Sequence, residues 1–152
     1  KAIQFIKNSS AAGSACEVEL PTPTPSGHDI LVKIEAIGLN PVDFKVRPAD
    51  GADPKTLGYD AAGVVASIGD KVTFFKAGDA VYYAGDITRP GSNAEFQLVD
   101  ERIVAQRPTS LDAATIGSSI SGLPLDRMAR RMPSRCSASS IAGTCGTCPR
   151  AR

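Results

Sequence analysis

The chain has 152 residues, with 17 Lys and Arg against 16 Asp and Glu and a formal net charge of +1. This near-neutral balance gives no electrostatic argument for a nucleic acid or an anionic membrane as a partner. Hydrophobic residues make up 42% of the chain, as in ordinary folded domains, and no run approaches the roughly 18 apolar residues of a membrane span.

Short strands are expected from the start of the chain. The first two are predicted at residues 1–6 and 17–20, where apolar and polar side chains alternate. Prolines at every second position of 21–25 then predict a surface loop, because proline cannot donate a ladder hydrogen bond.

Residues 30–37 carry the strongest strand pattern in the chain. Ile30, Val32 and Ile34 alternate with charged side chains, which is typical of a sheet with one wet face. Asn40 and Pro41 then predict a short helix through Arg47, with the Asn40 side chain as its N-cap.

Further strands are expected at residues 61–68, 80–84, 94–99 and 103–106, separated by turn residues. Six or seven short strands at close spacing favour a barrel or a sandwich. After them, Ser110 precedes a segment that resembles the first turn of a helix, which the residues beyond Thr115 are not expected to continue.

The composition changes near Thr115. Residues 1–115 have a net charge of −4 and contain all Phe and Tyr, whereas residues 116–152 have six Arg, no Lys, one acid and a net charge of +5. We therefore expect one folded domain at 1–115 and an atypical Arg/Ser/Cys-rich tail at 116–152, either disordered or translated in a shifted reading frame. Its Cys145 and Cys148 are expected to be inert thiols, with a redox pair or half of a metal site as alternatives.

Three blocks of sequence carry a family resemblance: GHDILVKIEAIGLNPVD at 27–43, LGYDAAGVVASIG at 57–69 and FKAGDAVY at 75–82. They resemble the N-terminal, GroES-like domain of the medium-chain dehydrogenase/reductase superfamily, most of all its quinone oxidoreductase and zinc-type alcohol dehydrogenase-like branch. The resemblance covers about residues 1–115. It implies a mainly β fold, a partly open GroES-like β-barrel with short helices.

The same resemblance implies a second domain in whole family members, a Rossmann domain with a Gly-rich dinucleotide loop. No such loop or βαβ pattern occurs in this sequence, so the nucleotide-binding domain is expected to be absent from this chain.

The resemblance also bears on zinc. Zinc-dependent members have a Cys near the position of Pro41 and Gly-His-Glu where this chain has Gly58, Tyr59 and Asp60. Both differences remove good zinc ligands, since a phenol and a lone carboxylate are weak substitutes for thiolate and imidazole. We therefore expect no metal site in the folded domain.

The resemblance places the loop after Ile37 and the segment at Gly58 in the cleft where nicotinamide and substrate meet. Asn40 and Tyr59 are the predicted catalytic residues, because an amide or a phenol can donate to a carbonyl oxygen that gains charge during hydride addition. The residues predicted to face substrate or cofactor are Asp43, Lys45, Arg47 and Asp60. The alternatives are a helix cap for Asn40 and surface charges for Lys45 and Arg47.

The function that this resemblance implies is the substrate-side domain of a zinc-independent oxidoreductase, which uses NADPH in the full-length family and reduces quinones or other conjugated carbonyls. Because hydride transfer needs a cofactor held against the substrate, this chain alone is expected to be inactive. The alternatives are a non-enzymatic binding or assembly module and a fragment of a zinc-dependent alcohol dehydrogenase. A homodimer is expected only of the full-length form, and the absence of a secretory signal at the start of the sequence favours the cytoplasm.

Overall fold

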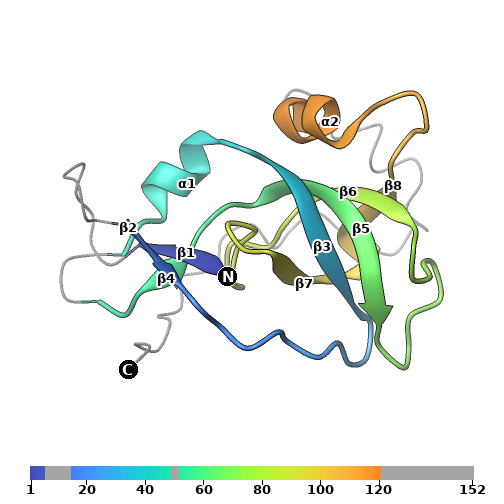
Figure 1. Ribbon diagram of the computed structural model, residues 1–152, viewed down its shortest axis with the longest axis horizontal. Helices are drawn as coiled ribbons and strands as arrows, with labels where there is room; N and C mark the ends of the chain where they lie inside the picture. The colour runs from blue at the N-terminus through green and yellow to red at the C-terminus, as the bar shows by residue number, and fades with distance from the viewer. Residues whose placement is uncertain (6–14, 49–51, 121–152) are drawn as a thin grey trace.

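The computed structural model describes residues 1–5, 15–48 and 52–120, which form two antiparallel sheets and two short α-helices (Figure 1). The smaller sheet has the order β2-β1-β4 and consists of β2 (Ala15–Val18), β1 (Ala2–Phe5) and β4 (Lys55–Thr56). The larger sheet has the order β7-β3-β5-β6-β8 and consists of β7 (Phe96–Asp100), β3 (Asp29–Gly38), β5 (Asp60–Ile68), β6 (Ala80–Ala84) and β8 (Val104–Gln106).

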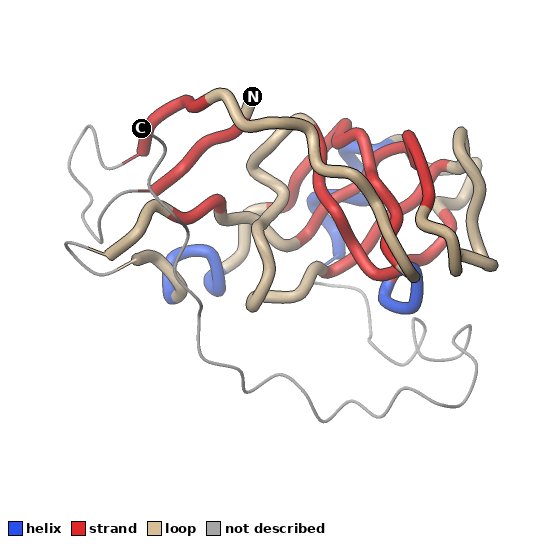
Figure 2. The backbone as a smooth tube through the Cα atoms, turned by 90° about the horizontal axis from the view of Figure 1, so that it is seen from below, coloured by secondary structure: helices blue, strands red, loops and turns tan. Residues whose placement is uncertain are grey.

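The strands of the larger sheet twist around a common interior (Figure 2). Register shifts between Leu31 and Val32 and between Ile34 and Ala36 interrupt the β3–β5 ladder, and such irregularities increase local twist. The two outer strands, β7 and β8, do not pair with each other in the part of the chain that the structure describes, so the sheet stays open. The expected mainly β, partly open architecture with short helices is confirmed.

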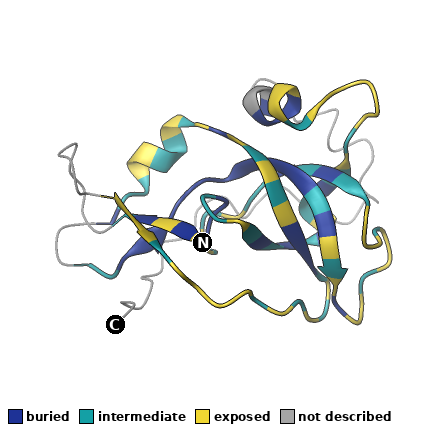
Figure 3. Cartoon of the chain, in the orientation of Figure 1, coloured by how far each residue is buried: buried dark blue, intermediate teal, exposed yellow. Residues whose placement is uncertain are grey.

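The hydrophobic core lies inside this sheet, and Figure 3 shows the buried residues along its strands. One polar pair is buried with it: the Tyr83 hydroxyl donates a hydrogen bond to Gln97 Oε1 at 2.8 Å. Burial raises the pKa of Tyr83, which keeps the phenol neutral. The apolar core members are Ile30, Val32, Ala61, Val65, Val81, Tyr83, Val99 and Val104.

Most of the strands lie where the sequence pattern predicts them, and the departures are small. β6 has the predicted bounds, and β3 and β5 extend the predictions by one or two residues. β2 lies two residues earlier than expected, and β7 begins two residues later. The two-residue strand β4 was not predicted, because a segment so short contains no alternation to detect.

Helix α1 (Pro41–Lys45) begins at the predicted residue and ends two residues before Arg47. Pro41 occupies its first turn, where a missing N–H costs nothing. Asn40 is the N-cap, and its backbone N–H donates to Asp43 Oδ2 at 2.8 Å. The Asn40 side-chain nitrogen is directed elsewhere, as described below.

Helix α2 (Ala113–Ser119) corrects the expectation for the region around Thr115. Its N-cap is Asp112 rather than Ser110, with Asp112 Oδ1 accepting from the Thr115 N–H at 2.6 Å. The helix then continues past Thr115, because Ile116 and Ile120 are buried, with 2% and 4% exposure. The remainder of the predicted tail, with Cys145 and Cys148, lies outside the described residues.

Glycines allow α2 to approach the sheet closely. A Cβ on Gly38, in β3, would lie 2.2 Å from the Gly117 carbonyl oxygen, so the two backbones touch.

Neither helix of the described ranges is long and apolar enough to cross a membrane.

Candidate functional site

The two segments predicted to form the site meet at one end of the larger sheet. β3 ends at Gly38, which pairs with Asp60, the first residue of β5. The loop at Leu39 and Asn40 therefore lies beside the start of β5. Because both strands are inside the sheet, backbone ladders fix the position of each segment.

Asn40 and Asp60 are in direct contact. Asn40 Nδ2 donates a hydrogen bond to Asp60 Oδ2 at 2.6 Å, shorter than the ordinary N–H···O distance of about 2.9 Å. Asp60 is 4% exposed, and this burial raises the pKa of its carboxyl. The hydrogen bond from Asn40 lowers the pKa, and the negative charge of Asp43 raises it. Asp60 is thus a buried carboxyl whose pKa is raised by its surroundings, and shifted pKa values are common at functional sites.

Asp43 holds Asn40 from the other side. One carboxylate oxygen, Oδ2, accepts from the Asn40 backbone N–H. The other, Oδ1, is buried and has no hydrogen-bond partner among the described residues. Asn40 is consequently fixed at two atoms by two carboxylates, and three of the six predicted site residues form one cluster.

Tyr59 lies next to this cluster in sequence but inside the protein, with 2% exposure. Lys55 Nζ lies 6.0 Å from the centre of its ring and also donates to the Ile87 carbonyl at 3.1 Å. The preceding residue, Gly58, has a positive φ of 92°. Such a buried phenol is in no position to contact a bound molecule in this conformation.

Lys45 is the last residue of α1, and Arg47 follows it by two residues. Lys45 is exposed in the last turn of α1. The Arg47 guanidinium lies 5.1 Å from the ring centre of Phe5 and 5.6 Å from that of Phe44, within cation–π range of both. Arg47 therefore joins α1 to the smaller sheet.

The side chains at this end of the sheet do not suit zinc. The described residues contain no group of three or more His, Cys, Asp or Glu that could hold a metal ion. The positions in question supply an amide, a phenol and a carboxylate that is already hydrogen-bonded to the amide. Zinc prefers thiolate and imidazole.

A second buried carboxylate escaped the sequence analysis. The Glu101 side chain is fully buried and accepts three hydrogen bonds, from His28 Nδ1 at 2.8 Å, from the Thr73 N–H at 2.9 Å and from the Phe74 N–H at 2.8 Å. Desolvation favours the neutral carboxyl, but these hydrogen bonds together outweigh it and hold the pKa of Glu101 below its usual value. The His28 side chain remains 43% exposed while its Nδ1 holds the buried carboxylate.

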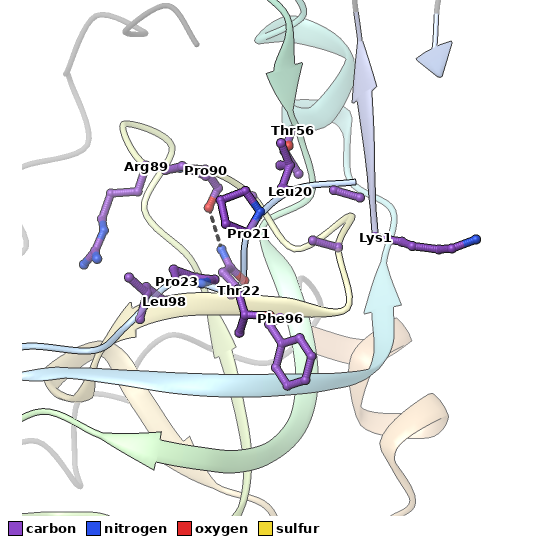
Figure 4. Close-up of a pocket in the computed structure, with 14 residues that line it drawn as sticks. Lys1, Leu20, Pro21, Thr22, Pro23, Thr56, Arg89, Pro90, Phe96 and Leu98 are labelled. Atoms are coloured by element: carbon purple, nitrogen blue, oxygen red, sulfur yellow. Dashed lines mark hydrogen bonds between the residues drawn. The ribbon is translucent and has the colours of Figure 1, made fainter. Parts of the chain in front are cut away.

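At least two cavities open on the surface of the described residues. The first, of about 310 Å³, lies between the Pro21–Pro23 loop and β7, with Pro21, Pro23, Phe96 and Leu98 around it (Figure 4). Gln97 Nε2 donates to the Pro90 carbonyl at 3.0 Å in its wall. The second, of about 560 Å³, is lined partly by Ile37 and Leu39, immediately before Asn40.

Comparison with known proteins gives a consistent result. The alcohol dehydrogenase GroES-like domain family matches residues 26–109, more than half of the chain. A zinc-type alcohol dehydrogenase-like protein from Staphylococcus epidermidis is 46% identical over 104 residues, covering 67% of this chain and 31% of that protein. Mouse quinone oxidoreductase is 36% identical over 98 residues, covering 62% of this chain and 29% of that protein.

A solved structure gives the same fold. The quinone oxidoreductase from Escherichia coli, crystallised in complex with NADPH, superposes with a TM-score of 0.67 at 26% identity, covering 78% of this chain and 36% of that one. The chain spans about a third of the length of these proteins. The resemblance to the GroES-like domain of the medium-chain dehydrogenase/reductase superfamily is confirmed.

Proposed function

Because the chain belongs to the alcohol dehydrogenase GroES-like domain family, we propose that it is the substrate-side domain of an oxidoreductase that reduces quinones or other conjugated carbonyls with NADPH and without zinc. The observation that carries this proposal is the 2.6 Å hydrogen bond between Asn40 and Asp60. Where zinc-dependent relatives are expected to have metal ligands, this chain has an amide that is hydrogen-bonded to a carboxylate.

The amide of Asn40 supplies the chemistry that a carbonyl substrate needs. NADPH, when bound, supplies the hydride, and the substrate oxygen then gains negative charge. A fixed N–H donor next to that oxygen stabilises the charge without any metal. Asn40 is only half-buried, whereas Tyr59 is almost fully buried. We therefore assign the donor role to Asn40.

Binding of a carbonyl compound to the chain tests the proposal. Duroquinone, a fully substituted quinone, is titrated into the isotope-labelled 152-residue protein while amide signals are followed by NMR. We expect shifts centred on Asn40, Asp43 and Asp60. The Asn40→Ala variant should have an affinity for duroquinone about tenfold lower, because one hydrogen bond is lost. Tyr59→Phe should leave the affinity unchanged.

Two controls accompany this titration. Gln106→Ala alters an exposed side chain of β8 and should bind like the parent protein. Metal analysis after incubation with zinc and gel filtration should find no stoichiometric metal. One tightly held zinc per chain, or duroquinone shifts that ignore Asn40, would show the proposal to be wrong.

An assembly module is a second candidate, and one observation favours it. Leu39 and Phe44 flank Asn40 in sequence and are 83% and 64% exposed. Exposed large apolar side chains close to a site are typical of surfaces that another domain or chain covers. Sedimentation tests this candidate. An assembly through this surface should dissociate after Leu39→Ser and Phe44→Ser, and an assembly that persists disfavours this surface as its interface.

A further inference from the structure

The hydrogen-bonding capacity of Asn40 is only partly used. Its side-chain amide has two N–H donors on Nδ2 and one acceptor oxygen. One N–H is bonded to Asp60 Oδ2 at 2.6 Å. Among the residues that the structure describes, no hydrogen bond is made by the second N–H. The direction of that second donor is nonetheless set, because the amide group is planar.

Asp60 is itself held rigidly. It begins β5 and pairs with Gly38 of β3 on one side and with Ala84 of β6 on the other. A Cβ at Gly38 would lie 3.2 Å from Asp60 Cβ, so the glycine leaves room for the base of the Asp60 side chain. A site built on paired strands positions a neighbour more accurately than a loop does.

The Asn40 backbone is fixed separately, by Asp43. Since Asp43 Oδ2 accepts from the Asn40 N–H, α1 determines where the Cα of Asn40 lies. Asp60 then holds the side-chain nitrogen of Asn40. The Asp43 carboxylate therefore holds the backbone of Asn40, and the Asp60 carboxylate holds its side-chain amide.

We propose that Asp60 is a positioning residue, whose carboxylate aims the Asn40 amide so that its second N–H is presented to the oxygen of a bound carbonyl compound. The part that concerns the carbonyl compound rests on the function proposed above. An ionised acceptor also strengthens the hydrogen bond that it accepts, which restricts the amide to one orientation. Asp60 touches Asn40 and acts through it.

The side-chain amide signals of Asn40 provide a test that does not depend on activity. They are assigned in the 152-residue protein by their absence from Asn40→Ala. In the parent protein we expect one of the two amide protons to lie well downfield, as a donor to a carboxylate. Asp60→Asn keeps the size and an acceptor oxygen, so the bond should persist while that proton moves upfield. Asp60→Leu has no acceptor, and both protons should approach the positions of a free amide.

Duroquinone binding to the same variants tests the consequence. Affinity should fall about tenfold in Asp60→Leu and less than about threefold in Asp60→Asn, because only the first loses the acceptor. Backbone spectra report whether each variant is folded. If Asp60→Leu does not fold, the comparison of the parent with Asp60→Asn decides.

Each result bears on one statement. Unchanged Asn40 amide protons in folded Asp60→Leu, or in Asp60→Asn where the leucine variant is unfolded, would overturn the positioning role. The expected amide shifts without any duroquinone binding would support the aiming of Asn40 by Asp60 and would instead contradict the proposed function.

Discussion

Two buried carboxylates lie at opposite ends of β3. Glu101 accepts hydrogen bonds near His28, where the strand begins, and Asp60 pairs with Gly38, where it ends. Both are almost fully buried, with 1% and 4% exposure. The pKa of Glu101 is nevertheless lowered, whereas that of Asp60 is raised.

The number of donors explains this difference. Glu101 accepts from a side chain and two backbone amides, which together stabilise its charge despite desolvation. For Asp60, desolvation prevails over the single amide of Asn40, and the charge of Asp43 opposes ionisation further. Burial alone therefore does not identify a site; a buried carboxyl with few donors beside an accessible amide is the stronger candidate.

The largest expected effect is the loss of Glu101. Glu101→Leu leaves the N–H groups of Thr73 and Phe74 without their acceptor, so the free energy of unfolding should fall by about 3 to 5 kcal/mol. Urea unfolding measures this change. Glu17→Gln removes one partner of an exposed ion pair and should change little. A Glu101→Leu protein as stable as its parent would contradict the structural role of Glu101 at the start of β3.

Two glycines with positive φ, Gly58 before β5 and Gly78 before β6, should differ next. Gly58 and Gly78 have nearly equal φ values, 92° and 93°. A Cβ at Gly58 would meet Ser92 Oγ and Asn93 Oδ1 at 2.7 Å, whereas a Cβ at Gly78 would meet no atom of the described residues within 4 Å, its chain neighbours aside. We expect Gly78→Ala to cost about 1 kcal/mol, from backbone strain alone, and Gly58→Ala about 3 kcal/mol. Equal thermal unfolding curves for the two variants would contradict this packing.

The smallest effect is a difference in pH dependence, and its sign differs between the two ends. The lowered pKa of Glu101 means that its ionisation stabilises the fold above pH 4.5, the ordinary value, and that this contribution is lost as the pH falls through the folded-state pKa. The raised pKa of Asp60 acts oppositely, so protonation favours the fold as the pH falls from that raised value towards 3.8.

Urea unfolding at a series of acidic pH values measures both contributions. Relative to the parent, Glu101→Gln should lose less stability on acidification, and Asp60→Asn should lose more. If both substitutions changed the acid dependence in the same direction, the contrast between the two carboxylates would be refuted.

The strands and α1 were predictable because their signals are local. Ile30, Val32 and Ile34 alternate within one strand, and Asn40 followed by Pro41 marks a helix start. β4 and α2 were harder, because β4 is set by pairing with β1 and α2 by burial of Ile116 and Ile120. Tertiary contacts decide such segments, and periodicity does not report them.

The distinction between local sequence signals and tertiary contacts also holds for the candidate site. The family resemblance pointed to Asn40 and Asp60, and the structure brings them into contact although twenty residues separate them. Tyr59 and Arg47 have side chains of suitable chemistry but are directed into the protein or towards Phe5 and Phe44. Glu101 could not be found, because its partners at residues 28, 73 and 74 are distant in sequence.

The proline loop beside β7 has a consequence for the outer edge of the larger sheet. β7 is an outer strand, and outer strands invite other chains to add to the sheet. Pro21 and Pro23 lie across the cavity from it, and proline lacks the N–H with which a strand extends a ladder. The loop therefore lies beside β7 without continuing the sheet.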